Sequence, residues 1–99
     1  MSIRVLDHDG IVTVSLAGEI DLETSPEVRR TLLEQLADGR ALHVDMAEVN
    51  YIDSSGIASL VEAHQRAQDR GQEFVLVRVS APVMKVLRLA RLDRVFTIR

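Results

Sequence analysis

The chain has 99 residues, of which 46% are hydrophobic, and its 12 basic and 15 acidic side chains give a net charge of −3. This composition is typical of one globular domain with one hydrophobic core, so we expect a single domain over residues 1–99. Cysteine is absent, which excludes disulfides, thiol catalysis and thiolate metal sites. There is no block of basic charge for nucleic acid, no signal-peptide pattern and no apolar run near the roughly 20 residues that cross a bilayer. We therefore expect a cytoplasmic protein that binds neither nucleic acid nor a membrane directly.

The N-terminal segment predicts a β-hairpin. Apolar and polar residues alternate over residues 3–5 and 11–16, and Asp9-Gly10 separates the two runs. Asp-Gly between two such runs is typical of a tight turn, because glycine tolerates a positive φ. We expect two antiparallel strands here, followed by a loop over residues 18–23.

A helix follows this loop, and two starting points are open. Ser25 before Pro26 suits an N-cap with proline at the first helical position. Thr24 with Glu27 three residues later suits a capping box. The predicted apolar face of this helix comprises Val28, Leu32, Leu33 and Leu36.

The rest of the chain alternates between strand and helix patterns. We expect a strand over residues 41–46, a connector over 47–52 and a helix over about 54–70. A strand over 73–79 and a short strand or extended tail over 95–98 should flank a helix that opens at 80–82. The predicted buried stripe of this last helix comprises Val83, Val86, Leu87 and Ala90. Strand-helix-strand units imply parallel pairing through right-handed crossovers. The predicted fold is α/β, with a mixed sheet of four to five strands, an N-terminal antiparallel hairpin and three to four helices packed against the sheet.

The sequence carries no recognisable catalytic or metal-binding motif. Its histidines lack metal-ligand spacing, and it has neither a Gly-x-Ser-x-Gly elbow nor a Gly-rich phosphate loop. A triad of a serine, a histidine and Asp45 stays open at this point, because such triads are defined by geometry. We expect no enzyme activity, no cofactor and no metal, and we interpret the histidines as surface or core-edge residues: His8, His43 and His64.

The most informative segment is Asp53-Ser54-Ser55-Gly56, at the predicted start of a helix. Asp and Ser are favoured at this position because their side-chain oxygens accept hydrogen bonds from free backbone N–H groups. Gly56 is unexpected there, since glycine inside a helix costs roughly 0.5–1 kcal/mol relative to alanine. We therefore predict that another part of the chain approaches Gly56 closely. A helix N-terminus also tolerates an anion, so a phosphoserine is compatible with this position.

Three segments make the chain resemble the STAS domain family, and specifically the stand-alone anti-sigma factor antagonists. They are Gly-Glu-Ile-Asp at 18–21, Val-Asn-Tyr-Ile-Asp-Ser-Ser-Gly-Ile at 49–57 and Ser-Ala-Pro-Val-Met-Lys-Val-Leu at 80–87. The resemblance covers nearly the whole chain in order. Ile57-Ala58 and Ala90-Arg91 depart from the family pattern, in which glycines are frequent at both places, and both lie near surfaces that a partner could contact.

The resemblance implies a phosphorylation switch. In this family the unphosphorylated antagonist binds an anti-sigma factor, typically a serine kinase with a histidine-kinase-like ATP fold, and so frees the sigma factor. The kinase phosphorylates the serine directly after the motif aspartate, which is Ser54 here, and a PP2C-type serine phosphatase reverses this. Asp53, Ser55 and Gly56 would then belong to the partner-binding segment, and Asp21 would be either a partner contact or a loop-capping carboxylate.

A second function of the same family stays open. Some small STAS proteins are accessory subunits of ABC-type lipid transporters, where they bind the ATPase subunit and usually carry an altered acceptor residue. The intact Ser54 favours the antagonist over this alternative.

Overall fold

The computed structural model describes residues 1–99 and contains five strands and three helices. In chain order these are β1 Ser2–His8, β2 Ile11–Ile20, α1 Ser25–Ala37, β3 Ala41–Ile52, α2 Ser54–Asp69, β4 Phe74–Val77, α3 Ala81–Leu89 and β5 Thr97–Ile98. The strands form one sheet in the order β1-β2-β3-β4-β5, in which β1 is antiparallel to β2 and the other pairs are parallel. The predicted mixed α/β fold is confirmed, with five strands and three helices.

The N-terminal hairpin forms as predicted. Asp9 and Gly10 both have positive φ, 54° and 79°, which matches the twist of a two-residue hairpin turn. On β2, Val12, Val14 and Leu16 face the core and are at most 2% exposed. β1 is the outer strand of the sheet, and most of its residues are exposed.

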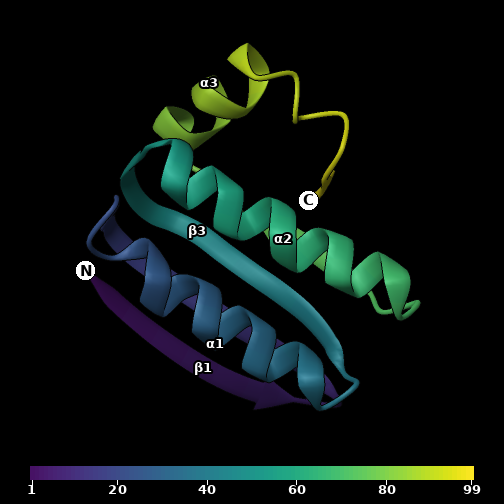
Figure 1. The fold of residues 1–99 in the computed structure, drawn as a ribbon. Coiled ribbons are helices and arrows are strands. Elements are labelled where there is room, and N and C mark those ends of the chain that lie inside the picture. The colour runs from purple at the N-terminus through teal and green to yellow at the C-terminus, as the bar shows by residue number, and fades with distance from the viewer.

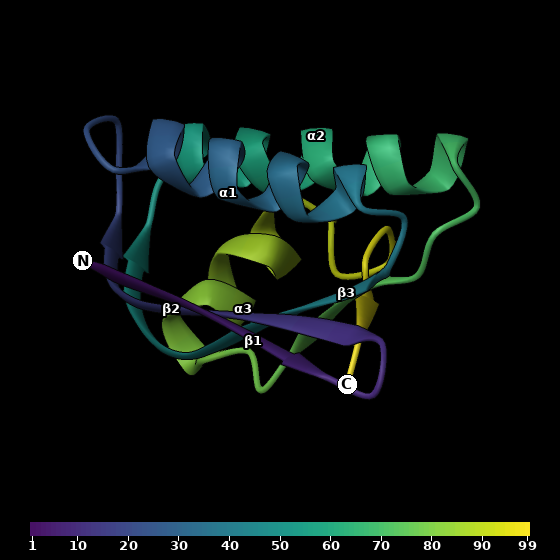
Figure 2. The ribbon, with the colours of Figure 1, turned by 90° about the horizontal axis from the view of Figure 1, so that it is seen from below.

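Helices α1 and α2 lie side by side on one face of the sheet and cover the core (Figure 2). They run in the same direction, so both N-termini lie at one end of the molecule and both C-termini at the other (Figure 1). The side chains of α1 that meet the sheet, Val28, Leu32 and Leu36, are fully buried as predicted. Each such burial contributes about 1.5–3 kcal/mol to stability. On the outer surface, the Arg29 guanidinium donates to both carboxylate oxygens of Glu62 at 2.8 and 2.7 Å, which joins the two helices.

Strands β2 and β3 are longer than the sequence pattern indicates. The predicted loop over 18–23 is wrong for residues 18–20, and the predicted connector over 47–52 is wrong throughout, because these segments pair with each other up to Ile20 and Ile52. Two register shifts, between Ser15 and Ala17 and between Gly18 and Glu19, interrupt the alternation of side chains, which explains why the local pattern does not show a strand. The two long strands bring the chain directly to Asp53.

Of the two predicted starts of α1, the structure has the one with Thr24 at the N-cap. The helix begins at Ser25, so Ser25 is not the N-cap, and Thr24 occupies that position without a side-chain cap bond. The Thr24 hydroxyl accepts from the N–H of Asp21 at 2.9 Å and lies 2.9 Å from the carbonyl oxygen of Glu19, to which it donates. Because this hydroxyl stabilises the preceding loop, the capping box does not form.

The C-terminal third is close to the prediction, with shorter elements. The predicted strand over 73–79 contracts to β4, and the tail forms β5. Helix α3 buries Val83 and Leu87 in the main core, whereas Ala90 is exposed and follows the helix, so its predicted burial is wrong. The Ser80 hydroxyl donates to the carbonyl oxygen of Val49 at 2.6 Å and ties the start of α3 to β3.

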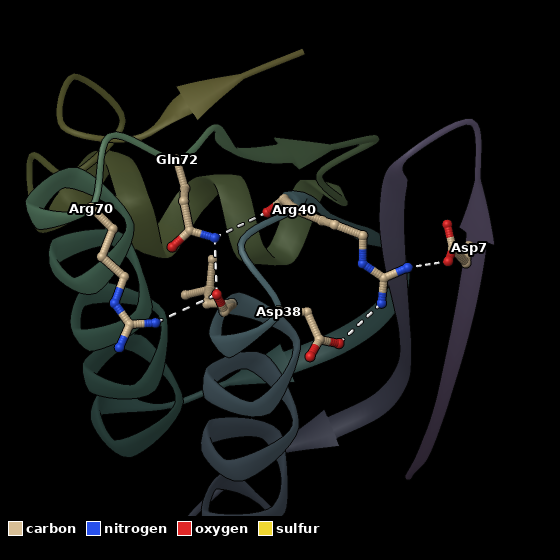
Figure 3. A network of polar contacts seen from close by, with 6 residues as sticks. Asp7, Asp38, Arg40, Arg70 and Gln72 are labelled. Carbon is tan, nitrogen blue, oxygen red and sulfur yellow. Dashed lines mark hydrogen bonds and ion pairs between the residues drawn. The ribbon is translucent and has the colours of Figure 1, made fainter.

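A polar network closes the end of the molecule where α1 and α2 terminate (Figure 3). The Gln72 amide donates to the carbonyl oxygens of Leu36 and Arg40 at 2.9 and 3.2 Å, and Arg40 in turn pairs with Asp7 and Asp38. These contacts connect the hairpin with the ends of both helices. None of the three helices has both the length and the apolar composition that a membrane span requires.

Candidate functional site

The candidate site lies at the opposite end, where β3 passes into α2. The backbone N–H of Asp53 donates to the carbonyl oxygen of Ile20 at 3.1 Å, which continues the β2–β3 pairing by one residue. The start of α2 is therefore attached to the end of β2. The loop that follows β2 is attached to the same point, so the predicted site residues Asp21 and Asp53 lie on neighbouring segments.

Asp53 is the N-cap of α2, as its residue type suggests. Its Oδ1 atom accepts from the backbone N–H groups of Ser55 at 2.9 Å and Gly56 at 3.2 Å, and from the Ser55 hydroxyl at 2.6 Å. The Ser55 hydroxyl bond is the largest influence on this carboxyl group and, with the two N–H groups, holds the pKa of Asp53 below its usual value, although partial desolvation opposes the shift. Asp53 is therefore a carboxylate with a fixed orientation.

Gly56 confirms the predicted close approach of the backbone. A Cβ atom at this residue would lie 2.6 Å from Cγ1 of Ile52 and 2.7 Å from Cγ2 of Ile20, distances that a real side chain does not reach. Ile20 and Ile52 are the last residues of β2 and β3. The first turn of α2 thus rests directly on the strand ends, and glycine is what allows it to do so.

The two serines of the motif differ in their surroundings. Ser55 is half-buried, and its hydroxyl donates to Asp53. Ser54 is exposed at the first position of α2, and its hydroxyl makes no hydrogen bond in this structure. The N–H groups of a first helical turn have no partners within the helix and form its positive end. Ser54 is therefore the hydroxyl of the motif that is available to another protein, in a place that favours added negative charge.

Asp21 organises the loop between β2 and α1. Its Oδ1 atom accepts from the N–H groups of Glu23 at 3.0 Å and Thr24 at 3.1 Å. The interpretation of Asp21 as a loop-capping carboxylate is thus confirmed. Its role as a partner contact stays a prediction, for which the second oxygen, Oδ2, has no hydrogen bond within the chain.

Two exposed apolar side chains at this end were not predicted as site residues. Leu22 is 77% exposed in the loop after β2, and Tyr51 is 49% exposed near the end of β3. Leu22 stands alone between the acidic residues Asp21 and Glu23, and this local contrast is the signal that could have identified it. Exposed apolar and aromatic side chains are typical of a protein-binding surface.

The histidines and Asp45 are engaged away from this site. Nε2 of His43 lies 2.7 Å from Glu73, and Asp45 accepts from Arg78 at 2.5 and 3.1 Å. His64 packs its ring edge-on against Phe74 and Phe96. Neither Ser54 nor Ser55 is hydrogen-bonded to a histidine, so the triad is not assembled. No three histidine or carboxylate side chains gather in a way that could hold a metal ion.

Comparisons with known proteins agree with this fold. The STAS domain family matches residues 2–99. An anti-sigma-B factor antagonist of Listeria monocytogenes is 32% identical over 97 residues, which cover 97% of this chain and 82% of that protein. The crystal structure of an anti-sigma factor antagonist from Mycobacterium paratuberculosis superimposes with a TM-score of 0.89 at 29% identity, over 98% of this chain and 83% of the other. The phosphorylated form of the Bacillus cell fate determinant SpoIIAA shares the fold, with a TM-score of 0.76 at 16% identity over 99% and 91% of the two chains.

The fold and site define a small α/β module with an exposed serine at a capped helix start. This protein belongs to the STAS domain family, and its relatives named above are anti-sigma factor antagonists, which are regulatory binding proteins.

Proposed function

We propose that this protein is an anti-sigma factor antagonist formed by a single STAS domain over residues 1–99. Its unphosphorylated form binds an anti-sigma factor, which then releases its sigma factor. The observation that carries the proposal is the exposed and unbonded Ser54 hydroxyl next to the oriented carboxylate of Asp53, in a chain related to named antagonists. The relatives named above are antagonists and not transporter subunits, which favours this function over an ABC-transporter accessory role.

We propose further that the anti-sigma factor is itself a serine kinase with a histidine-kinase-like ATP fold, and that it phosphorylates Ser54. Three hydrogen bonds to its Oδ1 atom fix the orientation of the Asp53 carboxylate. In this orientation Asp53 presents Ser54 to the kinase. Ser55 is committed to Asp53 and is not the acceptor. The kinase supplies the catalytic groups, so this chain needs none. A PP2C-type serine phosphatase returns the protein to its binding form.

The switch acts through charge. A phosphate adds about −1.5 to −2 charges at neutral pH. The surrounding surface is already acidic, since Glu19 and Glu23 are exposed and Asp21 and Asp53 are half-buried. Where the docked face meets acidic groups of the partner, the phosphate adds repulsion and a desolvation cost that oppose rebinding, and each 1.4 kcal/mol of lost binding is about tenfold in affinity. Because the helix N-terminus accommodates the phosphate, the fold persists while binding to the partner is lost. SpoIIAA, with the same fold, exists in a solved phosphorylated form.

A release assay tests the proposal. The protein is added to a purified complex of the anti-sigma factor and its sigma factor, and free sigma factor is measured with and without ATP. We expect release without ATP and loss of release with ATP. The Ser54→Ala variant should keep releasing sigma factor in the presence of ATP, whereas the control Ser55→Ala should remain switchable. The proposed function is contradicted if no sigma factor is released in either condition.

A further inference from the structure

Charge is unevenly distributed along this chain. Residues 78–99 contain six basic residues and one acidic residue, a net charge of +5, whereas residues 1–77 contain six basic and 14 acidic residues, a net charge of −8. The overall charge of −3 is therefore the sum of an acidic N-terminal part and a strongly basic C-terminal part. Such an asymmetry bears on which surfaces attract a partner and on how that partner is oriented.

The basic residues at the end of α3 form a patch without internal partners. Elsewhere in the chain, Arg29, Arg40 and Arg78 are each paired with a carboxylate. By contrast, the four basic side chains of α3 and the following turn are exposed and form no ion pair. We call these four residues the basic patch: Lys85, Arg88, Arg91 and Arg94.

The backbone holds the patch in a defined shape. Arg91 follows α3 with a φ of +59°, a conformation in which glycine is favoured and a larger side chain is strained. The N–H of Leu92 donates to the carbonyl oxygen of Leu87 at 2.8 Å and closes the helix there. Arg88, Arg91 and Arg94 then surround a hollow of about 350 Å³ together with Asp93. Three guanidinium groups around one hollow are well suited to carboxylate groups, to which they donate paired hydrogen bonds.

An apolar groove adjoins the basic patch. Val79, Met84 and Leu89 line this groove of about 520 Å³ together with Lys85 and Arg88. Leu89 is 76% exposed, although it lies on a helix. Alternating apolar and basic contacts favour a protein surface that carries both carboxylates and apolar side chains. A nucleic acid is disfavoured, because the one aromatic residue of this segment, Phe96, is buried and no aromatic ring is available for base stacking.

The basic patch and Ser54 belong to neighbouring elements. Figure 1 shows α3 next to the N-terminal end of α2, and the bond from Ser80 to Val49 fixes the start of α3 on the strand that leads to Ser54. The surface around Asp21 and Asp53 is the acidic end, and the basic patch continues from the start of α3 along that helix and the turn after it. A protein that contacts both the acidic end and the basic patch must carry acidic groups opposite the patch.

We propose that the basic patch is a second docking site for the same anti-sigma factor and binds an acidic, partly apolar surface on it. This inference rests on the proposed function. The acidic end and the basic patch together set the orientation in which the partner docks, so that Ser54 meets the kinase active site. Charges of this kind act mainly on the association rate and on its salt dependence.

The test uses two charge-reversal pairs that change the net charge equally. Arg88→Glu with Arg94→Glu alters the basic patch. Arg4→Glu with Arg70→Glu is the control, since Arg4 and Arg70 are exposed, form no ion pair with a carboxylate and lie on β1 and at the end of α2. Association and dissociation rates with the purified anti-sigma factor are measured at low and high ionic strength. Thermal midpoints verify that each variant is folded.

At low ionic strength we expect the basic-patch pair to slow association at least about tenfold and the control pair to slow it less than about threefold. The difference between the two pairs should shrink at high ionic strength, because salt screens the charges. Equal effects of the two pairs, or no effect of either, would overturn the docking site while the proposed function stands. If the unaltered protein does not bind the anti-sigma factor, the proposed function fails and this inference fails with it. The chain could also form a dimer that the basic-patch pair abolishes while anti-sigma binding is unaffected. That result would assign the patch to self-association and overturn the proposal.

Discussion

Helices α1 and α2 begin side by side, and each has a serine at its first helical position, yet only one start presents that serine. Ser25 is 5% exposed, because α2 packs over it and the Ser59 hydroxyl donates to its carbonyl oxygen at 3.3 Å. Ser54 is exposed with an unbonded hydroxyl. The difference arises from the packing of the two helices and not from local sequence, so tertiary structure decides which serine a kinase can reach.

The two starts also differ in how they are capped. Asp53 caps α2 with its carboxylate, whereas the hydroxyl of Thr24 serves the preceding loop and leaves α1 without a side-chain cap. A carboxylate therefore caps the helix that begins with Ser54, whereas no side chain caps the helix that begins with Ser25. The following predictions test whether this contrast is the basis of the site.

The largest effect is expected at the exposed serine. Ser54→Asp places a permanent negative charge at the acidic end of the docking side and should weaken binding to the anti-sigma factor at least about tenfold, a loss of about 1.4 kcal/mol or more. Isothermal titration calorimetry measures this. Ser54→Ala is the control and should bind within about threefold of the unaltered protein. The thermal midpoint of Ser54→Asp should be nearly unchanged, and an unfolded variant would mean that the serine serves the helix start instead.

Gly56 is expected to show the next largest effect, on stability. Gly56→Ala forces a methyl group against Ile20 and Ile52, and such overpacking typically costs about 1–3 kcal/mol of unfolding free energy. Chemical denaturation measures this change. The control is Ala58→Gly at an exposed residue of the same helix, which isolates helix propensity and should cost about 1 kcal/mol. If propensity alone mattered, Gly56→Ala would stabilise the protein, and that outcome would contradict the close approach.

Removal of the cap should have a smaller effect that distinguishes the two helix starts. Asp53→Ala removes the carboxylate that accepts three hydrogen bonds at the start of α2, and it should lower the thermal midpoint by about 4–8 °C. Amide hydrogen exchange should become faster for residues 54–57. In Thr24→Ala the exchange in the first turn of α1 should stay unchanged, since this hydroxyl does not cap the helix. Equal exchange effects at the two helix starts would contradict the difference in capping.

The smallest effect concerns acid stability. Hydrogen bonds from the Ser55 hydroxyl, and from the N–H groups of Gly56 and Ser55, lower the pKa of Asp53 in the folded state. The stabilisation is therefore complete above the unfolded pKa of about 3.9 and is lost as the pH falls through the lower folded value. Thermal midpoints of the unaltered protein and Asp53→Asn, compared from neutral pH to below pH 4, should converge in acid. A difference that stays constant or widens would contradict a stabilising carboxylate.

The sequence predicts the hairpin, the apolar faces of the helices and the mixed sheet, because alternation and helical spacing are local signals. It also predicts a close contact at Gly56, but the partners Ile20 and Ile52 come from a pairing between distant segments that only the fold shows. The extension of β2 and β3 is hidden by the two register shifts. The difference between Ser54 and Ser55, and the exposure of Leu22, likewise depend on tertiary packing.

Site-resolved phosphorylation tests the central claim most directly. The protein and its Ser54→Ala and Ser55→Ala variants are incubated with the anti-sigma factor kinase and ATP, and the phosphorylated residue is located by mass spectrometry. Our account predicts one phosphate on Ser54, none on Ser54→Ala and a modified Ser54 in Ser55→Ala. Phosphate on Ser55 or Ser25, or full phosphorylation of Ser54→Ala, would contradict it.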